Sequence, residues 1–311
     1  MKKLFYSLLI LVAAACSSHH EPAEMNVATY NLRLSNGGDS IRGNGWGQRA
    51  PYVAKLIQYH DFDIFGTQEG KHHQLEDLKE MMPEYEYIGV GRDDGAQGGE
   101  YAAIFYKPER FELLDSGNFW LSTDTTRPNL GWDAACIRVC TWGKFRDKES
   151  DKTFVYFNLH MDHVGVVARA ESAKLILEKI KAFPEKLPVM LSGDFNVDQT
   201  NESYLLLQNS DIMADAYTTA EMVYANNGTF NDFETDCYTD ERIDHIFLSP
   251  EFKVKKYGVL TDTYRAPAEE ATETVDTSNF PKEVSLHRFT ARTPSDHFPV
   301  AIRVELTDSE K

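Results

Sequence analysis

Apolar residues recur along the chain with two spacings, and these separate the predicted strands from the predicted helices. Alternating or unbroken apolar runs of strand length occur at 25–34, 63–67, 154–159, 189–191, 242–248 and 300–304. Apolar residues three and four apart, the spacing of a helix, occur at 48–60, 72–82 and 167–183. The second helix should end before Pro83, because proline cannot continue a helix. Further short strands are expected between 85 and 146, so the chain is predicted to be an α/β protein.

The same pattern predicts one large domain at 25–305. No linker, repeat or low-complexity stretch interrupts these roughly 280 residues, a length that suits one domain and would also permit two. The stretch 261–292 is acidic and rich in Glu, Thr and Pro, and we expect a long loop there. Loops of that length in a compact domain are usually functional or mobile. Residues 306–311 are expected to form a polar tail.

The N-terminus has the pattern of a bacterial export signal. Two lysines precede an apolar run at 4–12, which is shorter than the about 20 residues that a membrane-spanning helix needs. Three alanines then lead into Cys16, and this tetrapeptide resembles the bacterial lipobox. We therefore expect a lipoprotein signal peptide at 1–15, lipidation of Cys16 and a tether at 16–24. An ordinary signal peptide is the alternative. The protein is expected in the bacterial cell envelope, periplasmic or at the cell surface, touching the membrane only through this lipid anchor.

The charge of the chain limits the substrates that it can attract. The formal net charge is −17, and loss of Lys2 and Lys3 with the signal peptide would make it −19. High-affinity nucleic-acid binding relies on Lys and Arg that displace counterions from phosphates, so a polyanionic partner is disfavoured. A small phosphoester is not disfavoured, because a bound divalent cation can reverse the local field.

Polar side chains stand where the predicted strands end. One polar residue after a buried strand needs no special explanation, but six endings that each offer Asn, Asp, Glu or His predict one site assembled from several strands. These endings are Thr29-Tyr30-Asn31, Gln68-Glu69, Asn158-Leu159-His160, Gly193-Asp194-Phe195-Asn196, Ile243-Asp244-His245 and Ser295-Asp296-His297.

The residue types at these endings suit a hard divalent cation. Carboxylate and amide oxygens without thiolates favour Mg2+ or Mn2+ over zinc. Glu69 is the first candidate ligand, followed by Asn31 and Asp296. Magnesium keeps several waters and binds substrate phosphate directly, so few protein ligands are needed.

The other candidates fit the remaining tasks of phosphoester hydrolysis. The reaction needs a group that activates or positions water and groups that stabilise charge at phosphorus. Asp194 with Asn196 fits the first task. His160 and His297 fit the second, and a carboxylate such as Asp244 could hold one imidazole in its useful tautomer.

The cysteines of the predicted domain and four of its histidines are not expected to carry chemistry. Besides Cys16 the chain has Cys136, Cys140 and Cys237, without a Cys-x-x-Cys pair, which disfavours a zinc site and a disulfide framework. Cys136 and Cys140 lie four apart in an alternating segment, so we expect buried free thiols on one face of a strand. Four histidines without a supporting motif are expected on the surface: His72, His73, His245 and His287.

In order and spacing, the six endings resemble the signatures of the endonuclease/exonuclease/phosphatase superfamily, which has the deoxyribonuclease I-like fold. The resemblance runs from about residue 25 to 304. It implies a four-layered α/β sandwich with two central mixed β-sheets and the site at one end. The roles that it implies are Glu69 as principal metal ligand, Asn31 and Asp296 near the metal, Asp194 orienting or deprotonating water, Asn196 and His160 contacting phosphate, and Asp244 supporting His297.

Within that superfamily the chain looks most similar to a bacterial group of exported metal-dependent hydrolases. The similarity lies in Asn31-Leu32-Arg33, Trp46-x-x-Arg49, Phe119-Trp120-Leu121-Ser122, Gly131-Trp132-Asp133 and Arg292-Thr293-Pro294-Ser295. Arg33, Trp46 and Arg49 either line a substrate pocket, with the arginines gripping a phosphate or sugar, or pack at the N-terminal end of a helix. The exonuclease III branch usually has an aromatic residue where His160 stands, which argues against abasic-site DNA repair.

We therefore expect an exported, monomeric, Mg2+- or Mn2+-dependent phosphoester hydrolase, a phosphodiesterase acting on a small or lipid-like substrate. A nuclease that scavenges extracellular nucleic acid is the first alternative, and strong salt dependence of binding would favour it. Activity of the sphingomyelinase or inositol-phosphate phosphatase type also stays open. A catalytically inactive surface binding protein is a further alternative, against which the intact Glu69, Asp194 and His297 count.

Overall fold

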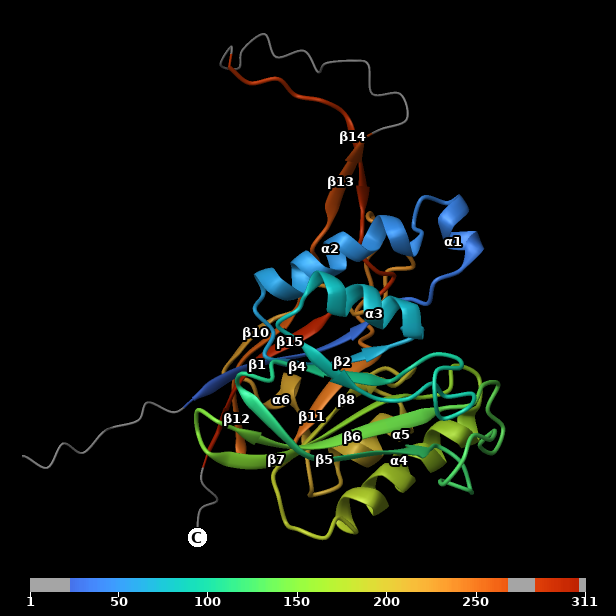
Figure 1. Ribbon diagram of the computed structural model, residues 1–311, viewed down its shortest axis with the longest axis vertical. Helices are drawn as coiled ribbons and strands as arrows, with labels where there is room; N and C mark the ends of the chain where they lie inside the picture. The colour runs from blue at the N-terminus through green and yellow to red at the C-terminus, as the bar shows by residue number, and fades with distance from the viewer. Residues whose placement is uncertain (1–22, 268–282, 308–311) are drawn as a thin grey trace, which may run out of the picture.

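The computed structural model describes residues 23–267 and 283–307, and within them two β-sheets lie face to face with helices on their outer faces (Figure 1). The four-layered α/β sandwich with two central mixed sheets is thus confirmed. No helix in the described part of the chain combines the length and apolar character needed to span a bilayer. The signal peptide at 1–15, Cys16, most of the tether, the middle of the 261–292 segment and the last four residues lie outside the described residues.

The first sheet holds the N-terminal and C-terminal strands of the domain side by side. Its strands in the described residues follow the order β10-β12-β15-β1-β2-β4-β3. Their bounds are β1 Glu24–Asn31, β2 Ile64–Gln68, β3 Glu86–Ile88, β4 Ala103–Tyr106, β10 Met222–Tyr224, β12 Phe252–Val259 and β15 Val300–Leu306. β1 is parallel to β2 and antiparallel to β15, so both ends of the domain are secured in one sheet.

The second sheet contributes the other half of the sandwich. Its described strands follow the order β5-β6-β7-β8-β11-β9. Their bounds are β5 Phe111–Trp120, β6 Val139–Asp147, β7 Lys152–His160, β8 Val189–Asp194, β9 Ala214–Asp215 and β11 Asp244–Leu248. β7 and β8 are parallel, whereas β11 runs antiparallel to β8 and starts where β8 ends.

The longer helices match the predicted ones to within two residues. α2 (Trp46–Tyr59) and α3 (His72–Met81) pack on the first sheet, and α4 (Val166–Lys181) and α5 (Glu202–Gln208) pack on the second (Figure 1). Three short helices were not predicted: α1 (Gly37–Ile41), α5 and α6 (Ala216–Thr219). Helices this short show little periodicity in the sequence. α6 contacts β11 and β12, one strand from each sheet.

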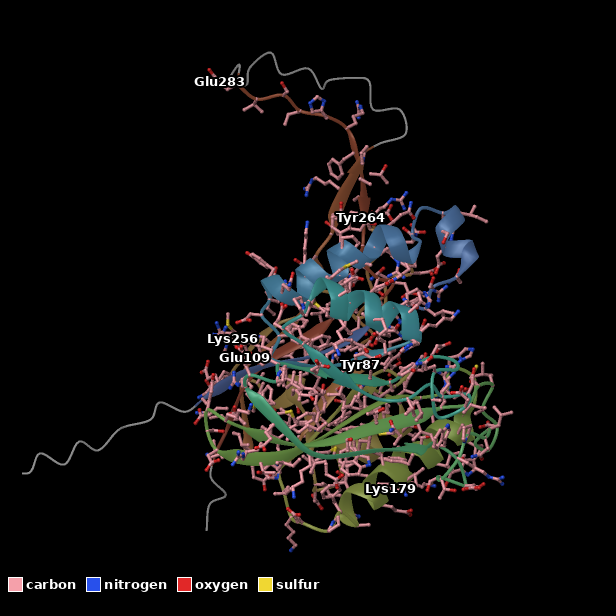
Figure 2. The ribbon with its side chains drawn as sticks, in the orientation of Figure 1. Tyr87, Glu109, Lys179, Lys256, Tyr264 and Glu283 are labelled. Carbon is pink, nitrogen blue, oxygen red and sulfur yellow. The ribbon has the colours of Figure 1, made fainter. Side chains whose placement is uncertain are left out.

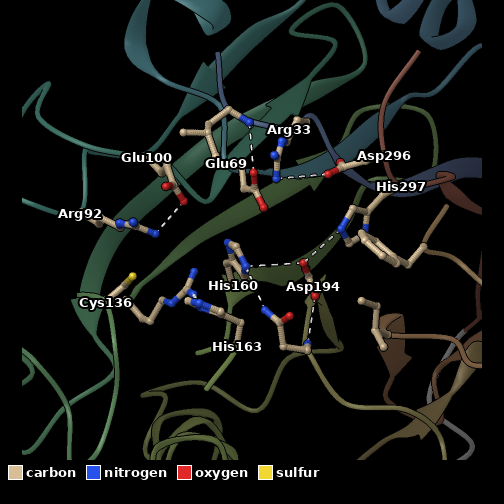
Figure 3. A pocket seen from close by; sticks show the side chains of 15 residues that line it. Arg33, Glu69, Arg92, Glu100, Cys136, His160, His163, Asp194, Asp296 and His297 are labelled. Atoms are coloured by element: carbon tan, nitrogen blue, oxygen red, sulfur yellow. Dashed lines mark hydrogen bonds and ion pairs between the residues drawn. The ribbon is translucent and has the colours of Figure 1, made fainter. Parts of the chain in front are cut away.

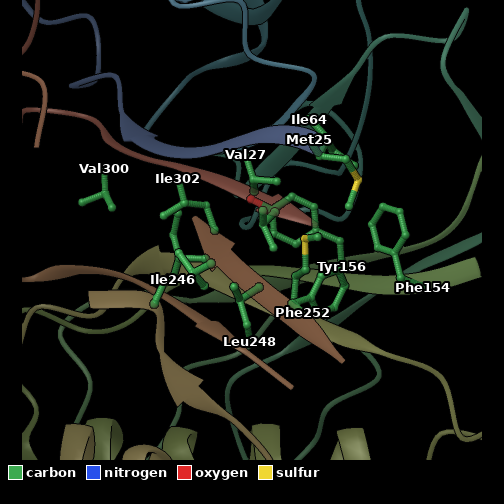
Figure 4. Packing of buried hydrophobic residues seen from close by; sticks show 14 of the residues in the cluster. Met25, Val27, Ile64, Phe154, Tyr156, Ile246, Leu248, Phe252, Val300 and Ile302 are labelled. Atoms are coloured by element: carbon green, nitrogen blue, oxygen red, sulfur yellow. The ribbon is translucent and has the colours of Figure 1, made fainter. Parts of the chain in front are cut away.

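Strand alternation divides the buried side chains between three apolar layers. Along β1, Met25 and Val27 face the other sheet, whereas Ala28 and Tyr30 face α2 and α3. Figure 4 shows Val27 among the residues packed between the sheets, with Tyr156 of β7 opposite. The inward-facing positions of β1, β2, β7 and β8 become polar near the C-terminal ends of these strands.

Asn158 of β7 links the two sheets between the apolar core and that polar end. Its Nδ2 donates to the backbone oxygens of Thr67 and Ala103, each at 2.9 Å. Its Oδ1 accepts from Gln68 Nε2 at 2.8 Å and from Ser192 Oγ at 3.0 Å. A Cβ at Gly66 would lie 2.3 Å from Asn158 Oδ1, so only glycine permits this approach.

The 261–292 segment departs from the predicted loop at both ends. β13 (Tyr264–Pro267) and β14 (Phe289–Arg292) pair as an antiparallel ribbon that projects from the body of the molecule. Figure 2 shows Tyr264 at the base of the ribbon and Glu283 far from it. The Tyr264 ring stacks on Tyr52 of α2 with ring centroids 3.7 Å apart. The loop prediction rested on composition, which does not reveal two short strands that, among the described residues, pair with each other and with no other strand.

Two smaller predictions were wrong. His245 is completely buried, because its position on β11 faces the helices: its Nε2 lies 3.0 Å from the Val197 oxygen, and its ring packs beside Tyr204 and Phe247. Cys136 precedes β6 instead of sharing a strand face with Cys140, and it is only half-buried. Cys140 is a buried free thiol, as expected.

Replacing Asn158 by alanine should destabilise the fold without adding steric strain. The change removes the Asn158 donor from two carbonyl oxygens and leaves one N–H of the Gln68 amide unpaired, the other still donating to Thr29. Each buried unpaired group costs about 1–3 kcal/mol, so the free energy of unfolding should fall by about 3–5 kcal/mol. Urea denaturation measures this change. The control Thr153→Ala, half-buried on the same strand, should cost less than about 1 kcal/mol. Equal effects of the two substitutions would show that Asn158 is no link between the sheets.

Candidate active site

The site forms where the inner strands of both sheets end. Register places Asn31 beside Gln68, and His160 beside Asp194. Asp244, the first residue of β11, lies opposite Asp194. Because these side chains share the inner faces, strand ends far apart in the sequence bring their polar groups together.

An open cavity of about 410 Å3 lies over these strand ends (Figure 3). Its lining residues are Arg33, Leu34, Glu69, Arg92, Glu100, Cys136, Arg138, His160, His163, Asp194, Asn196, Phe230, Ile243, Asp296 and His297. Of the residues proposed from the sequence for metal binding or catalysis, only Asn31 and Asp244 are missing from this lining. Both lie directly behind it, hydrogen-bonded to residues that do line it.

Hydrogen bonds from the end of β1 and the segment that follows it hold Glu69 at the cavity. Asn31 Nδ2 donates to Glu69 Oε1 at 3.1 Å, and the Leu34 amide donates to Glu69 Oε2 at 3.1 Å. The same Nδ2 donates to Asp194 Oδ2 at 2.9 Å, so one amide joins two carboxylates. The Arg33 amide in turn donates to Asn31 Oδ1 at 3.0 Å, which fixes the orientation of the Asn31 side chain.

Three residues that line the cavity have left-handed backbone conformations. Arg33, Glu69 and Asn196 have φ of 55°, 63° and 51°, and each follows closely after the end of a strand. Such a conformation costs a residue other than glycine about 1–2 kcal/mol. Strain of this kind persists only where surrounding contacts enforce it and is concentrated at functional sites. Here it accompanies the placement of all three side chains on the lining of the cavity.

Asp194, His297 and Asp244 form a buried row of charges. His297 Nδ1 lies 2.8 Å from Asp244 Oδ2, and His297 Nε2 lies 3.8 Å from Asp194 Oδ2. Burial, joined by the nearby Asp244 carboxylate, raises the pKa of Asp194 to about 7. Burial alone would lower the pKa of His297, but Asp244 and Asp194 raise it well above its usual value. His297 is therefore an imidazolium near neutral pH, with Nδ1–H donating to Asp244.

His160 has the opposite protonation state. Burial, together with the Arg138 and Arg92 guanidinium groups, lowers the pKa of His160 well below its usual value. Its Nε2 lies 3.1 Å from Asn196 Nδ2 and 3.4 Å from Asp194 Oδ2. Because an amide nitrogen only donates, Nε2 of the neutral ring accepts from Asn196. The Asn196 backbone amide also donates to Asp194 Oδ1 at 2.9 Å.

Asp296 and Arg33 close the opposite side of the cavity. Arg33 Nη1 lies 3.3 Å from Asp296 Oδ2, and Arg33 Nε donates to the buried Asp39 at 2.9 Å. Burial raises the pKa of Asp296 to about 6; the carboxylate of Glu69 adds to the shift, and His297 and Arg33 oppose it. The Arg33 side chain keeps a partial exposure of 29%, so it can still reach a ligand in the cavity.

The sequence profile of the Endonuclease/Exonuclease/phosphatase family matches residues 28–297, which is most of the chain. The chain belongs to the endonuclease/exonuclease/phosphatase family. As a member of this family, it is a hydrolase that acts on phosphoesters, and enzymes of the family generally depend on a divalent metal.

Two solved structures from Bacteroides thetaiotaomicron are similar over almost the whole chain. A crystal structure of an endonuclease/exonuclease/phosphatase family protein is 50% identical with a TM-score of 0.86, covering 93% of this chain and 100% of that one. A mannosyl-6-phosphatase is 51% identical with a TM-score of 0.83, covering 90% of this chain and 99% of that one.

Among curated proteins, nocturnin from Rattus norvegicus is more distant. It is 25% identical in an alignment 213 residues long, which covers 61% of this chain and 46% of nocturnin. The chain thus spans about half the length of this curated relative. The catalytic domain of human nocturnin, at 18% identity and a TM-score of 0.65, shares the fold.

The donor atoms in this endonuclease/exonuclease/phosphatase site fit a divalent cation. Glu69, His160 and Asp194 each offer a ligand atom, and these atoms lie within 4.8 Å of one another. Carboxylates dominate the set and no thiolate belongs to it, which suits a hard cation. The raised pKa of both Asp194 and Asp296 expresses first the cost of burying a carboxylate and then the repulsion from a neighbouring one, and a bound cation would offset both.

Eight lining residues were not proposed as site residues from the sequence: Leu34, Arg92, Glu100, Cys136, Arg138, His163, Phe230 and Ile243. Most come from loops whose spacing carries no periodic signal. Ile243 belongs to the recognised ending Ile243-Asp244-His245, and Leu34 and His163 closely follow recognised endings, so this proximity was the one signal for them. Asp39, which holds Arg33, had no signal at all.

Trp46 and Arg49 do not line the cavity. Arg49 is completely buried and donates to the backbone oxygens of Asn44, Leu32, Pro294 and Arg33 at 2.7–3.1 Å. Trp46 Nε1 donates to Asp77 Oδ2 at 2.8 Å. A guanidinium committed to four carbonyl groups cannot grip a substrate, so of the two alternatives the packing role fits both residues, and Arg33 alone of the three faces the cavity.

Replacing Arg49 by methionine should therefore impair folding more than binding. The variant leaves buried carbonyl oxygens unpaired, and the free energy of unfolding should fall by at least about 3 kcal/mol. Chemical denaturation of Arg49→Met and of the matched Arg33→Met variant gives the comparison. Arg33→Met should lose less stability. An Arg49→Met protein of unchanged stability would refute the packing role.

Proposed function

We propose that the protein is an exported, Mg2+- or Mn2+-dependent phosphomonoesterase whose substrate is a sugar phosphate. The observation that carries the proposal is the cavity itself, about 410 Å3 in volume, near the lower end of the about 300–1,000 Å3 typical of small-molecule sites. A space of this size suits one small ester. The 51% identity to a mannosyl-6-phosphatase supports a sugar as the alcohol part.

The charges around the cavity also support a small phosphate over a nucleic acid. The partly exposed guanidinium of Arg33 and the protonated His297 line it, although the whole chain carries a net charge of −17. These local cations bind a phosphate well, whereas the acidic surface repels a long polyanion. A monoester also carries more negative charge than a diester, so we favour it over the phosphodiester expected from the sequence alone.

The proposed roles follow from the hydrogen bonds. Asp194, poised near neutral pH and oriented by Asn31 and the Asn196 amide, takes a proton from the attacking water. His297, kept protonated by Asp244, donates to a phosphoryl oxygen as negative charge develops. Asn196 contacts the phosphate beside it, with the neutral His160 behind.

Glu69 is the proposed principal ligand of the divalent cation, with Asn31 and Asp296 beside it. When bound, the cation neutralises phosphoryl oxygens and favours attack at phosphorus. Arg33 lies between Asp39 and Asp296 and compensates the carboxylates on this side.

Activity measurements test the proposal directly. The purified protein is assayed with mannose 6-phosphate, an aryl phosphomonoester, an aryl phosphodiester and single-stranded DNA, each with Mg2+, with Mn2+ and with chelator. We expect metal-dependent release of phosphate from the monoesters. Asp194→Asn should lower kcat by roughly 10²–10⁴-fold, the usual contribution of a general base. The control Asp198→Asn changes a carboxylate of the same loop outside the cavity lining and should retain activity.

Each other outcome would replace the proposal with a specific alternative. Cleavage of the diester without the monoesters would restore the phosphodiesterase hypothesis. Efficient DNA cleavage with steep salt dependence would make the protein a nuclease. Turnover that survives chelation would remove the metal from the mechanism, and full activity of Asp194→Asn would remove that carboxylate.

The proposed location rests on the N-terminal sequence. A basic start, an apolar run and three alanines before Cys16 support export and lipidation. Cys16→Ser should move the protein from the membrane fraction to the soluble fraction and abolish incorporation of labelled fatty acid. The matched variant is Cys237→Ser, which changes an exposed cysteine of the folded domain and should leave fractionation unaltered. Identical fractionation of both variants would rule out a lipid anchor at Cys16.

A further inference from the structure

One wall of the cavity takes no part in the proposed phosphate chemistry. Arg92 and Glu100 come from the segment between β3 and β4, Arg138 immediately precedes β6, and His163 follows β7. Figure 3 shows Arg92 and Glu100 on the side of His160 away from Asp296 and His297. A substrate whose phosphate lies near Asp194 would extend its remaining part towards this wall.

The positive charges of this wall are already compensated. Arg92 Nη1 lies 2.6 Å from Glu100 Oε2, and Arg138 Nε lies 3.4 Å from Asp162 Oδ2. The side chains of the first pair are 15% and 14% exposed, and those of the second pair are 4% and 1% exposed. A second anionic group would meet no excess of positive charge here, so the wall suits an electrically neutral part of a ligand.

The wall nevertheless keeps hydrogen-bonding capacity. Within the described residues, Arg92 Nε and Arg138 Nη1 are buried without a hydrogen-bond partner, so a ligand in the cavity would reach them only through a bridging water. Arg138 Nη2 lies 3.0 Å from His163 Nδ1, and since a guanidinium only donates, His163 keeps Nε2–H as a further donor. Glu100 supplies an acceptor. Arg92 and Arg138 also border a void of about 10 Å3, room for at most one bridging water.

An aromatic residue faces the same cavity. Phe230 is 42% exposed, and its ring packs edge-on against His297 with centroids 5.1 Å apart. A pyranose has one face of C–H groups and a rim of hydroxyl groups that both donate and accept. The neutral wall with its donors and acceptor matches the hydroxyl rim, whereas Phe230 lies beside His297, on the other side of the cavity from Arg92 and Glu100 (Figure 3).

We infer that Arg92, Glu100, Arg138 and His163 form a subsite that binds the hydroxyl groups of a neutral sugar. This inference rests on the proposed phosphomonoesterase function and specifies the part of the substrate beyond the phosphate. The Arg92–Glu100 pair offers an acceptor beside a donor, the arrangement that binds two adjacent hydroxyl groups.

The test compares two monoesters that share the phosphate but differ in hydroxyl groups. For mannose 6-phosphate and an aryl phosphomonoester, kcat/KM is measured in wild-type protein and in Glu100→Gln. The kcat/KM for mannose 6-phosphate divided by that for the aryl phosphomonoester should fall at least 10-fold in the variant, mainly through a higher KM for the sugar phosphate. The matched control Glu86→Gln removes a carboxylate that pairs with Lys79 at 2.5 Å on the surface, and its ratio should equal that of wild type.

The outcomes separate this inference from the function on which it rests. Wild-type protein that hydrolyses neither monoester overturns the proposed function and the inference with it. If wild-type protein hydrolyses both esters and Glu100→Gln leaves the ratio of their kcat/KM values unchanged, the subsite alone is overturned. An equal loss of activity on both esters gives that same unchanged ratio. Melting temperatures are measured alongside. If Glu100→Gln unfolds, Arg92→Lys takes its place, because it keeps the charge but loses the planar group that binds hydroxyl pairs.

Discussion

The position of the Asn158 amide between the two sheets sets the geometry of the site. It bonds to β2, β4 and β8 at once, and the bare Gly66 backbone lets the sheets approach closely enough for this. On one side of the amide lies the apolar packing of Figure 4, and on the other lie the polar strand ends. Since side chains alternate along a strand, fixing Asn158 also fixes His160, two residues further and on the same face.

Beyond this link, the site is a compact arrangement of buried charges, each of which has a definite neighbour. Asp244 keeps His297 protonated, the two arginines near His160 keep that ring neutral, and Asn31 joins Glu69 to Asp194. Left-handed backbone at Arg33, Glu69 and Asn196 adds local strain. Buried charges and strained backbone destabilise the folded state. The extensive apolar layers between the sheets and under the helices stabilise it and so offset this cost.

The family and the fold could be predicted because the polar residues at strand ends occupy a fixed order along the chain. Alternation alone places Asn31, His160 and Asp194 on inner faces, and the helices α2, α3 and α4 follow from their spacing. Residues whose position depends on tertiary packing could not be predicted. Arg92 and Glu100 lie in a glycine-rich segment without periodicity, and Arg49 looks the same in sequence whether it faces a cavity or a set of carbonyl groups. His245 differs from a surface histidine only through the helices packed over β11.

The direction of β1 bears on how a tethered form of the protein would meet its substrate. The strand carries the chain from Glu24 to Asn31, directly into the site, over a length of about 23 Å at the usual rise per residue. An attachment through the N-terminus would therefore join the domain at the end of this strand remote from the cavity. Esters dissolved in the surrounding fluid would then reach the site more readily than headgroups embedded in the bilayer that holds the protein.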